Sequence, residues 1–269
     1  MGELLKRWHG VLAEQSPAAV ATVIGSPQRI GGKILITPED HLGTAGNDDL
    51  DRAIIEAARG MLEGGRTGTV HFGPRGQRRM EDVAVFIQSF APPPRMYVFG
   101  AIDFASAVAR IGKFMGYRVT VCDARPVFAT RERFPTADEV VVAWPDEFLK
   151  TAPVDKRTVI CVLTHDPKFD VPILVEALKT DAGYIGAMGS RRTHNNRTAR
   201  LKEEGVTDED LSRVSSPIGL DIGARTPEET AVAIAAEIIA LHTGHSGGRL
   251  AFRGGPIHAA EPAARESTR

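Results

Sequence analysis

Gly189, Ser190, Arg191 and Arg192 form the stretch of this chain best suited to binding an anion. They follow a short apolar segment and precede an expected helix, so backbone N–H groups, a hydroxyl and two guanidinium groups gather at one point. Such a point favours phosphate, because helix N-termini carry partial positive charge and guanidinium groups match phosphate oxygens. We predict a phosphate site here, against the alternative of a solvated basic helix start.

A second group of candidates lies between Arg95 and Asp123, where the pattern predicts a strand, a turn, a helix and a second strand. The first strand ends at Gly100, and apolar residues at helical spacing follow it. Asp123 comes about 20 residues later, the spacing of a carboxylate that binds a ribose hydroxyl. The candidate cofactor contacts in this unit are Gly100, Ala101, Asp103, Asp123 and Arg125.

The glycine fingerprint of a dinucleotide-binding turn is incomplete in this unit. The fingerprint is G-x-G-x-x-G or G-x-G-x-x-A, and here Ile102 replaces the middle glycine. Asp103 adds negative charge where a phosphate would sit. The sequence therefore predicts the strand–helix–strand unit. It leaves open whether the turn of this unit binds a nucleotide or binds none.

Two further strand ends carry candidate residues, namely His165, Asp166 and Gly186. His165 could serve as a general base, a ligand contact or a metal ligand, because its charge changes near neutral pH. The alternative is a structural hydrogen bond that closes the end of the strand. We predict no catalytic residue and no metal site.

The elements that must position these residues alternate between strands and helices. Apolar, β-prone runs predict strands over 96–99, 118–122, 139–143, 157–163 and 184–188. Residues 218–223 are a sixth strand or an ordered loop. Helices are expected over 105–115, 146–151, 171–179, 193–204 and 227–241. The helix over 171–179 would have Pro172 in its first turn, and Thr226 would cap the last helix.

This alternation predicts a Rossmann-like α/β fold, an open parallel sheet with helices on both faces. In such sheets ligands bind beyond the carboxyl ends of the strands, so the candidate residues should converge there. We expect a C-terminal domain over 95–243 and a disordered tail over 244–269, which is rich in Gly, Ala, Pro and charge.

The first 91 residues predict a small α+β domain, joined to the next by the stiff linker 92–94, which is three prolines. Helices are expected over 3–14 and 50–63, strands over 18–24, 33–37, 69–72 and 82–90, and a glycine-bearing turn over 42–49. The acidic cluster Asn47, Asp48, Asp49 and Asp51 could bind a cation. We favour a helix N-cap, which explains acidic residues in a first turn without a ligand.

Composition excludes several classes of function. The 269 residues have a net charge of −1, which argues against a nucleic-acid partner held by charge. No apolar stretch reaches the roughly 18 residues of a membrane span, and the charged N-terminus does not resemble a secretory signal. The two cysteines, Cys122 and Cys161, lie in expected strands. We interpret them as reduced core thiols of a cytoplasmic protein.

Three motifs carry a family resemblance: residues 92–100, the stretch YIGAMGSRR at 184–192, and SPIGLDIGA at 216–224 followed by TPEE at 226–229. With them the sequence resembles the XdhC/CoxI family over about residues 17–241. The family comprises accessory proteins of molybdenum hydroxylases such as xanthine dehydrogenase and aerobic carbon monoxide dehydrogenase. Its members are thought to bind the molybdenum cofactor, to protect it or help its sulfuration, and to hand it to the apo-enzyme.

The resemblance implies a maturation chaperone rather than a turnover enzyme, with molybdopterin or its dinucleotide form as ligand. Residues 189–192 would hold phosphate, Asp123 a ribose hydroxyl, and His165 with Asp166 the head group. The implied partners are the large subunit of a hydroxylase, a cysteine desulfurase and a second copy of the chain. This chain lacks two cysteines that relatives carry, with residues 48–51 and 80–82 in their regions, and the family's Gly-Ala-Gly-His turn reads GAID at 100–103.

Two other functions stay open at this point. An NAD(P)-dependent oxidoreductase would use Asp123 to favour NAD, or Arg125 to accept a 2′-phosphate, although no complete hydride-transfer signature is present. An interaction module for hydroxylase assembly would need no small ligand.

Overall fold

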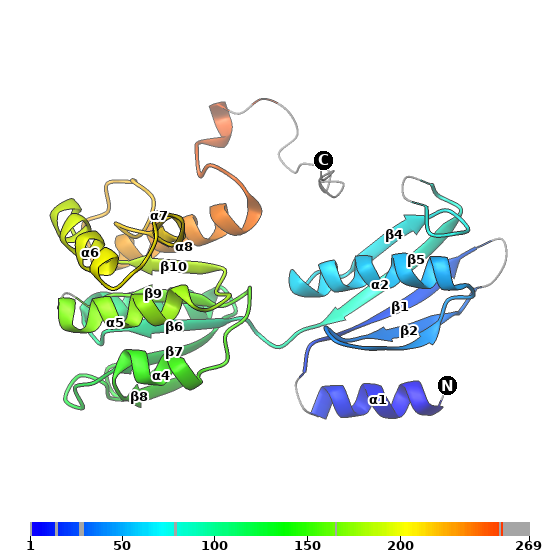
Figure 1. The fold of residues 1–269 in the computed structure, drawn as a ribbon, viewed down its shortest axis with the longest axis horizontal. Coiled ribbons are helices and arrows are strands. Elements are labelled where there is room, and N and C mark those ends of the chain that lie inside the picture. Colours follow the sequence, from blue (N-terminus) through cyan, green and yellow to red (C-terminus); the bar gives the residue numbers. More distant parts are fainter. Residues whose placement is uncertain are drawn as a thin grey trace. The chain divides into compact units, whose positions relative to one another are not determined.

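The computed structural model describes residues 2–13, 16–26, 30–77, 80–164, 166–252 and 254. Its chain divides into two compact units, Met1–Pro94 and Arg95–Arg269, whose elements are labelled in Figure 1. Each unit is described by itself. In the described part of the chain, no helix combines the length and the apolar character needed to cross a membrane.

The N-terminal unit is an antiparallel sheet with a helix on each face. Its strands, in the order β3-β2-β1-β5-β4, are β1 Ala18–Gly25, β2 Lys33–Ile36, β3 His41–Thr44, β4 Gly68–Phe72 and β5 Val83–Phe90. Side chains alternate along β1, so Ala19 and Ala21 pack with the helix α2, Asp48–Glu63. Ala18 packs on the opposite face with Val11 of α1, Gly2–Ala13.

The start of α2 explains the acidic cluster without a ligand. The side chain of Asn47 caps the helix by accepting the Leu50 N–H at 2.9 Å, and Asp51 accepts the Ala45 N–H at 2.6 Å. The N-cap interpretation is confirmed. The strand β3 was not predicted, because Gly43 and its polar neighbours are typical of a turn. Gly43 has φ +107°, and a Cβ there would collide with the Lys33 carbonyl of β2.

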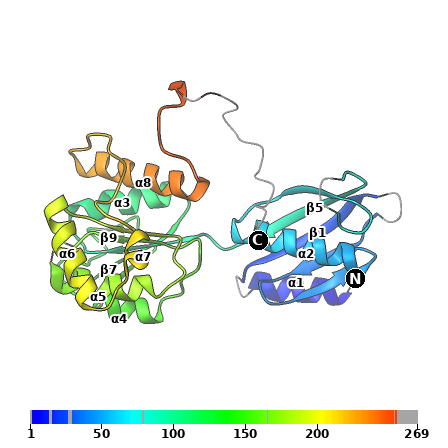
Figure 2. The ribbon, with the colours of Figure 1, turned by 45° about the horizontal axis from the view of Figure 1, so that its top comes forward.

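The C-terminal unit is a six-stranded parallel sheet with helices on both faces, as the sequence predicts. In the order β11-β10-β9-β6-β7-β8 its strands are β6 Arg95–Phe99, β7 Arg118–Asp123, β8 Glu139–Val142, β9 Val159–Val162, β10 Tyr184–Ala187 and β11 Val214–Ser215. The helices α3, Asp103–Phe114, and α8, Pro227–Thr243, lie together on one face (Figure 2). The other face carries α4 Pro145–Thr151, α5 Pro167–Leu178 and α6 Arg191–Glu203.

Burial on both faces accounts for the apolar strands of this sheet. In β6, Met96 and Val98 pack with α3 and α8, while Tyr97 and Phe99 pack toward α4 and α5. The two cysteines follow the same alternation: Cys161 faces α3 and α8, and Cys122 faces the opposite side. Both thiols are free and buried, and burial raises the pKa of each to about 12. They are core thiols, as interpreted from the sequence.

Two local features differ from the prediction. The helix α5 begins at Pro167, with Asp166 as its N-cap, so Pro172 lies inside the helix rather than in its first turn. The short helix α7, Asp208–Ser212, and the two-residue strand β11 were not predicted, because neither is long enough to show a periodicity. Of the two alternatives for residues 218–223, the structure shows the loop.

The last helix begins and ends with clear signals. Thr226 and Glu229 form a capping box at the start of α8, and Gly244 closes the helix in the left-handed conformation. The described residues of the tail, 244–252 and 254, include the 3₁₀ turn Leu250–Phe252. The disorder expected over residues 253 and 255–269 concerns residues outside the described part of the chain.

Candidate functional site

The centre of the candidate site is the gap between the carboxyl ends of β6 and β9. The chain moves from β6 outward to β7 and β8, then returns to β9 on the other side of β6, which makes this gap the topological switch point. Gly100 ends β6 with φ +101°. A Cβ there would lie 2.8 Å from Thr164 Cγ2 and 2.9 Å from Thr164 N, so only glycine allows the two loops to meet.

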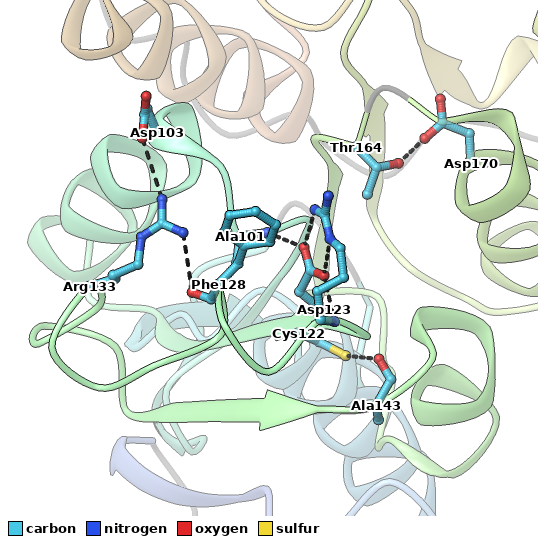
Figure 3. A network of polar contacts seen from close by, with 10 residues as sticks. Ala101, Asp103, Cys122, Asp123, Phe128, Arg133, Ala143, Thr164 and Asp170 are labelled. Atoms are coloured by element: carbon cyan, nitrogen blue, oxygen red, sulfur yellow. Dashed lines mark hydrogen bonds and ion pairs between the residues drawn. The ribbon is translucent and has the colours of Figure 1, made fainter.

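Asp123, at the end of β7, is held by groups of its own domain (Figure 3). Its carboxylate accepts the Ala101 N–H at 2.7 Å, the Arg125 N–H at 2.9 Å, and two guanidinium hydrogen bonds from Arg125 at 2.9 and 2.8 Å. Burial raises the pKa of Asp123, but these hydrogen bonds outweigh it and hold the pKa below its ordinary value. The predicted ribose contact stays a prediction, and it would require Arg125 to move away.

The turn after β6 therefore offers little to a phosphate in this state. One of its N–H groups already binds Asp123, and the side chain of Asp103 is exposed and pairs with Arg133 at 3.4 Å (Figure 3). The Arg125 guanidinium pairs with Asp123 and stacks 4.5 Å from the centre of the Phe128 ring, although its side chain stays 43% exposed. The turn with the incomplete glycine fingerprint thus already makes hydrogen bonds and an ion pair with residues of its own domain.

A buried polar network links the ends of β9 and β10. The Thr164 hydroxyl donates to Asp170 on α5, as Figure 3 shows, and Asp170 pairs with Arg197 on α6 at 2.8 Å. Arg197 also donates to the Met188 carbonyl at 2.6 Å. The side chains of Asp170 and Arg197 are 2% and 5% exposed. Burial raises the pKa of Asp170 to about 6, against the opposing attraction of Arg197.

Two cavities open at this end of the sheet, and Thr193 in the first turn of α6 lines both. The larger, about 380 Å³, is here called the sheet-end cavity. Its walls are Phe104, Met188, Gly189, Ser190, Thr193, Pro217, Ile218 and Thr230. The smaller, about 240 Å³, is called the arginine cavity. Its walls are Pro167, Asp170, Arg192, Thr193, Asn196, Arg197 and Arg200.

The four residues of the predicted phosphate site separate between these cavities. Gly189 and Ser190 line the sheet-end cavity, Arg192 lines the arginine cavity, and Arg191 is exposed and lines neither. Ser190 is the N-cap of α6, since its hydroxyl accepts the Thr193 N–H at 3.2 Å. Successive residues of a helix point about 100° apart, which accounts for the different directions of Arg191 and Arg192.

The remaining predicted contacts have other surroundings. A Cβ on Gly186 would meet the side chain of Ile218, so this glycine makes room for the loop after β11. Asp166 caps α5 by accepting the Lys168 N–H at 2.9 Å. His165 lies outside the described residues. Gly100 lies against Thr164, whose hydroxyl binds Asp170, and Asp170 pairs with Arg197. Arg197 also binds the carbonyl of Met188, directly after β10, so the loops after β6, β9 and β10 do meet.

The sequence interpretation missed Asp170 and Arg197, which hold these loops together. The sequence contained one signal that α6 buries a polar side chain, because Ala199 and Leu201 are the only apolar residues of this helix. A helix packed against a neighbour with so little apolar surface must bury a polar side chain, and a buried arginine needs a carboxylate. Asp170, directly before an apolar run, was the acid to suspect.

A third and larger cavity, about 910 Å³, lies between α8 and residues 243–252, away from the strand ends. Among the described residues no cluster of three His, Cys, Asp or Glu side chains could hold a metal ion. The candidate site is therefore the pair of cavities beside α6.

Comparison with known proteins agrees with this architecture. A family model described as the XdhC Rossmann domain matches residues 96–238, and one described as the XdhC and CoxI family matches residues 11–73. A solved structure described as a xanthine dehydrogenase of Bacillus halodurans has a TM-score of 0.51 at 20% identity, over 88% of this chain and 95% of the other. At that identity the likeness shows the fold alone.

Two curated relatives match the chain over 58% of its length. A probable xanthine dehydrogenase subunit of Bacillus subtilis is 36% identical over 155 residues, which are 45% of that protein. The molybdenum cofactor insertion chaperone PaoD of Escherichia coli is 27% identical over 156 residues, which are 42% of that protein. The chain thus spans a little under half the length of these relatives. Because the Rossmann-domain model alone covers more than half of the chain, this protein belongs to the XdhC family.

Proposed function

We propose that this protein is a maturation chaperone that holds a molybdenum cofactor in the sheet-end cavity and passes it to a molybdenum hydroxylase. The observation that carries the proposal is a cavity at the carboxyl ends of the strands, beside the N-terminus of α6. Two further points support it: family membership, and the likeness to a relative named as a molybdenum cofactor insertion chaperone.

The walls of the sheet-end cavity suit a flat heterocycle that ends in a phosphate. Phe104, Met188 and Ile218 supply apolar surface, and its volume of about 380 Å³ falls within the range of small-molecule sites. Ser190 and Thr193, at the start of α6, line the same cavity, so the first N–H groups of the helix would offer donors to a phosphate. Arg191, exposed at the first position of the same helix, would add its charge to this end of the helix.

Asp123 and Gly100 have positioning roles in this proposal. The Asp123 carboxylate fixes the turn after β6 through the Ala101 N–H, and Gly100 lets that turn rest against Thr164. The loops that border the cavity are thereby held before any ligand arrives, which reduces the ordering that binding requires.

The same proposal names the partners. The cofactor is molybdopterin or its dinucleotide form, and the recipient is the large subunit of a hydroxylase of the xanthine dehydrogenase or carbon monoxide dehydrogenase type. A cysteine desulfurase would supply sulfur, and the chaperone would act as a homodimer in the cytoplasm. This chain lacks the two family cysteines. Any step that a thiol of this chain would perform is excluded from the proposal.

Replacing Ser190 tests the anionic contact without removing the helix cap. Both Ser190→Asp and Ser190→Asn keep an N-cap oxygen, but only Asp places negative charge where the phosphate should bind. We expect Asp to weaken cofactor binding at least about tenfold, since repulsion between close charges exceeds about 1 kcal/mol at a protein surface, and Asn to stay within about threefold. The measurement is titration of the full chain with purified cofactor, followed by pterin fluorescence.

Equal affinity of the two variants for the cofactor would show that the cofactor phosphate does not bind beside Ser190. A parallel titration with reduced nicotinamide dinucleotide addresses the oxidoreductase alternative, for which Asp123 and Arg125 are already engaged with each other. Saturable quenching of nicotinamide fluorescence, with no response to molybdenum cofactor, would replace the chaperone proposal by that alternative.

A further inference from the structure

The arginine cavity carries more positive charge than its structural role requires. Three guanidinium groups, those of Arg192, Arg197 and Arg200, line it together with the amide of Asn196. Its only acid is Asp170, which is already paired with Arg197. Arg192 and Arg200 are exposed and have no carboxylate partner among the described residues. In the described part of the chain, two cations on the wall of this cavity therefore have no carboxylate to neutralise them.

These side chains share one face of α6. Arg192, Asn196 and Arg200 follow one another at intervals of four residues, so their side chains lie one above the next along the helix. Arg192 also lies in the first turn of α6, where a cation opposes the helix dipole. The first turn of α6 has no acidic residue to offset this. A helix that breaks a local rule on the wall of a cavity is the pattern expected of a binding site.

A buried donor in the same cavity has no hydrogen-bond partner among the residues that the structure describes. Arg197 lines the cavity, its side chain is 5% exposed, and its Nε–H makes no hydrogen bond among the described residues although both of its terminal nitrogens do. An unsatisfied buried donor is costly and uncommon in a folded protein. An acceptor supplied from outside would satisfy it.

We propose that the arginine cavity binds a tetrahedral oxoanion, either free or as the phosphate group of a larger ligand. Its oxygens would accept from Arg192 and Arg200 at the mouth, from Asn196, and from the Nε–H of Arg197 at the base. The cavity volume of about 240 Å³ is ample for such an ion, since a single water needs only about 10–15 Å³ by the same measure. This site is separate from the sheet-end cavity, so either proposal can fail without the other.

Calorimetric titration of the full chain with inorganic phosphate, at constant ionic strength, tests this site. We compare the wild type with Arg192→Gln, Arg200→Gln and the control Lys202→Gln. Lys202 lies on the same helix, lines neither cavity and pairs with Asp208 at 2.6 Å, so its replacement removes the same charge elsewhere. Each arginine variant should bind phosphate about tenfold more weakly, as expected for a lost hydrogen bond to a charged group, and the control within about twofold.

An equal loss of phosphate affinity in Lys202→Gln would show that only the net charge of the protein matters, and it would overturn the proposal. An absence of saturable phosphate binding in the wild type would overturn it as well. A second arm with adenosine monophosphate in place of phosphate distinguishes the two sources of the anion. Tighter binding of the nucleotide, lost in Arg200→Gln, indicates a phosphorylated ligand, whereas phosphate binding alone indicates a free oxoanion. Because Arg192 and Arg200 are exposed, unfolding of these variants is not expected, and circular dichroism checks it.

Discussion

Replacing Arg197 by Met should lower the free energy of unfolding by about 3–5 kcal/mol, the range for breaking a buried ion pair by removing one partner. The variant leaves the Asp170 carboxylate buried, with the Thr164 hydroxyl as its only remaining side-chain donor among the described residues. It also removes the guanidinium donor of the Met188 carbonyl. Urea unfolding followed by circular dichroism measures the change.

Two further variants separate the ion pair from the loss of a long side chain. Arg200→Met on the same helix removes an exposed arginine and should change stability by less than about 0.5 kcal/mol. Adding Asp170→Leu to Arg197→Met removes the stranded carboxylate and should recover at least half of the loss, because apolar replacement of a whole buried pair is often tolerated. A double variant as unstable as the single one would contradict this account of the network.

Gly100→Ala is expected to destabilise the C-terminal unit by about 3 kcal/mol or more, because it combines backbone strain with a steric collision. The residue has φ +101°, and its new Cβ would lie under 3 Å from both the Thr164 backbone and its methyl group. Relief would require the loops after β6 and β9 to separate, and those loops form the switch point of the sheet.

Gly116→Ala is the matched control for this substitution. Gly116 has φ +84° at the end of α3, and a Cβ added there would have no neighbouring atom within 4 Å. This variant carries the backbone strain alone, which costs about 1–2 kcal/mol. The difference in unfolding free energy between the two variants measures the close contact with Thr164. Equal losses would show that the two loops are not in the contact described.

The elements that the sequence predicts well are those in which local signals agree. The strand over residues 96–99 is apolar throughout because both of its faces are covered, and α8 has Thr226, Pro227 and Gly244 at the positions where a helix begins and ends. Such signals depend on neighbours in sequence, so no knowledge of the fold is needed to interpret them.

The contacts that define the site depend instead on residues far apart in sequence. Asp123 has the spacing of a ribose-binding acid, but whether its oxygens are free depends on the Ala101 N–H, 22 positions away. The pair Asp170 and Arg197 is separated by 27 positions, and neither residue has a local signature. The division of Arg192 from Ser190 between two cavities follows from helix geometry, and could have been predicted once Ser190 was recognised as the N-cap.

Hydrogen–deuterium exchange of the full chain, with and without molybdenum cofactor, tests the central claim most directly, because it locates the ligand without altering the protein. The chaperone proposal predicts slower exchange of backbone amides in residues 186–193 and 217–220, the segments that border the sheet-end cavity. Slower exchange confined to residues before 95, or cofactor binding with no change in those two segments, would contradict it.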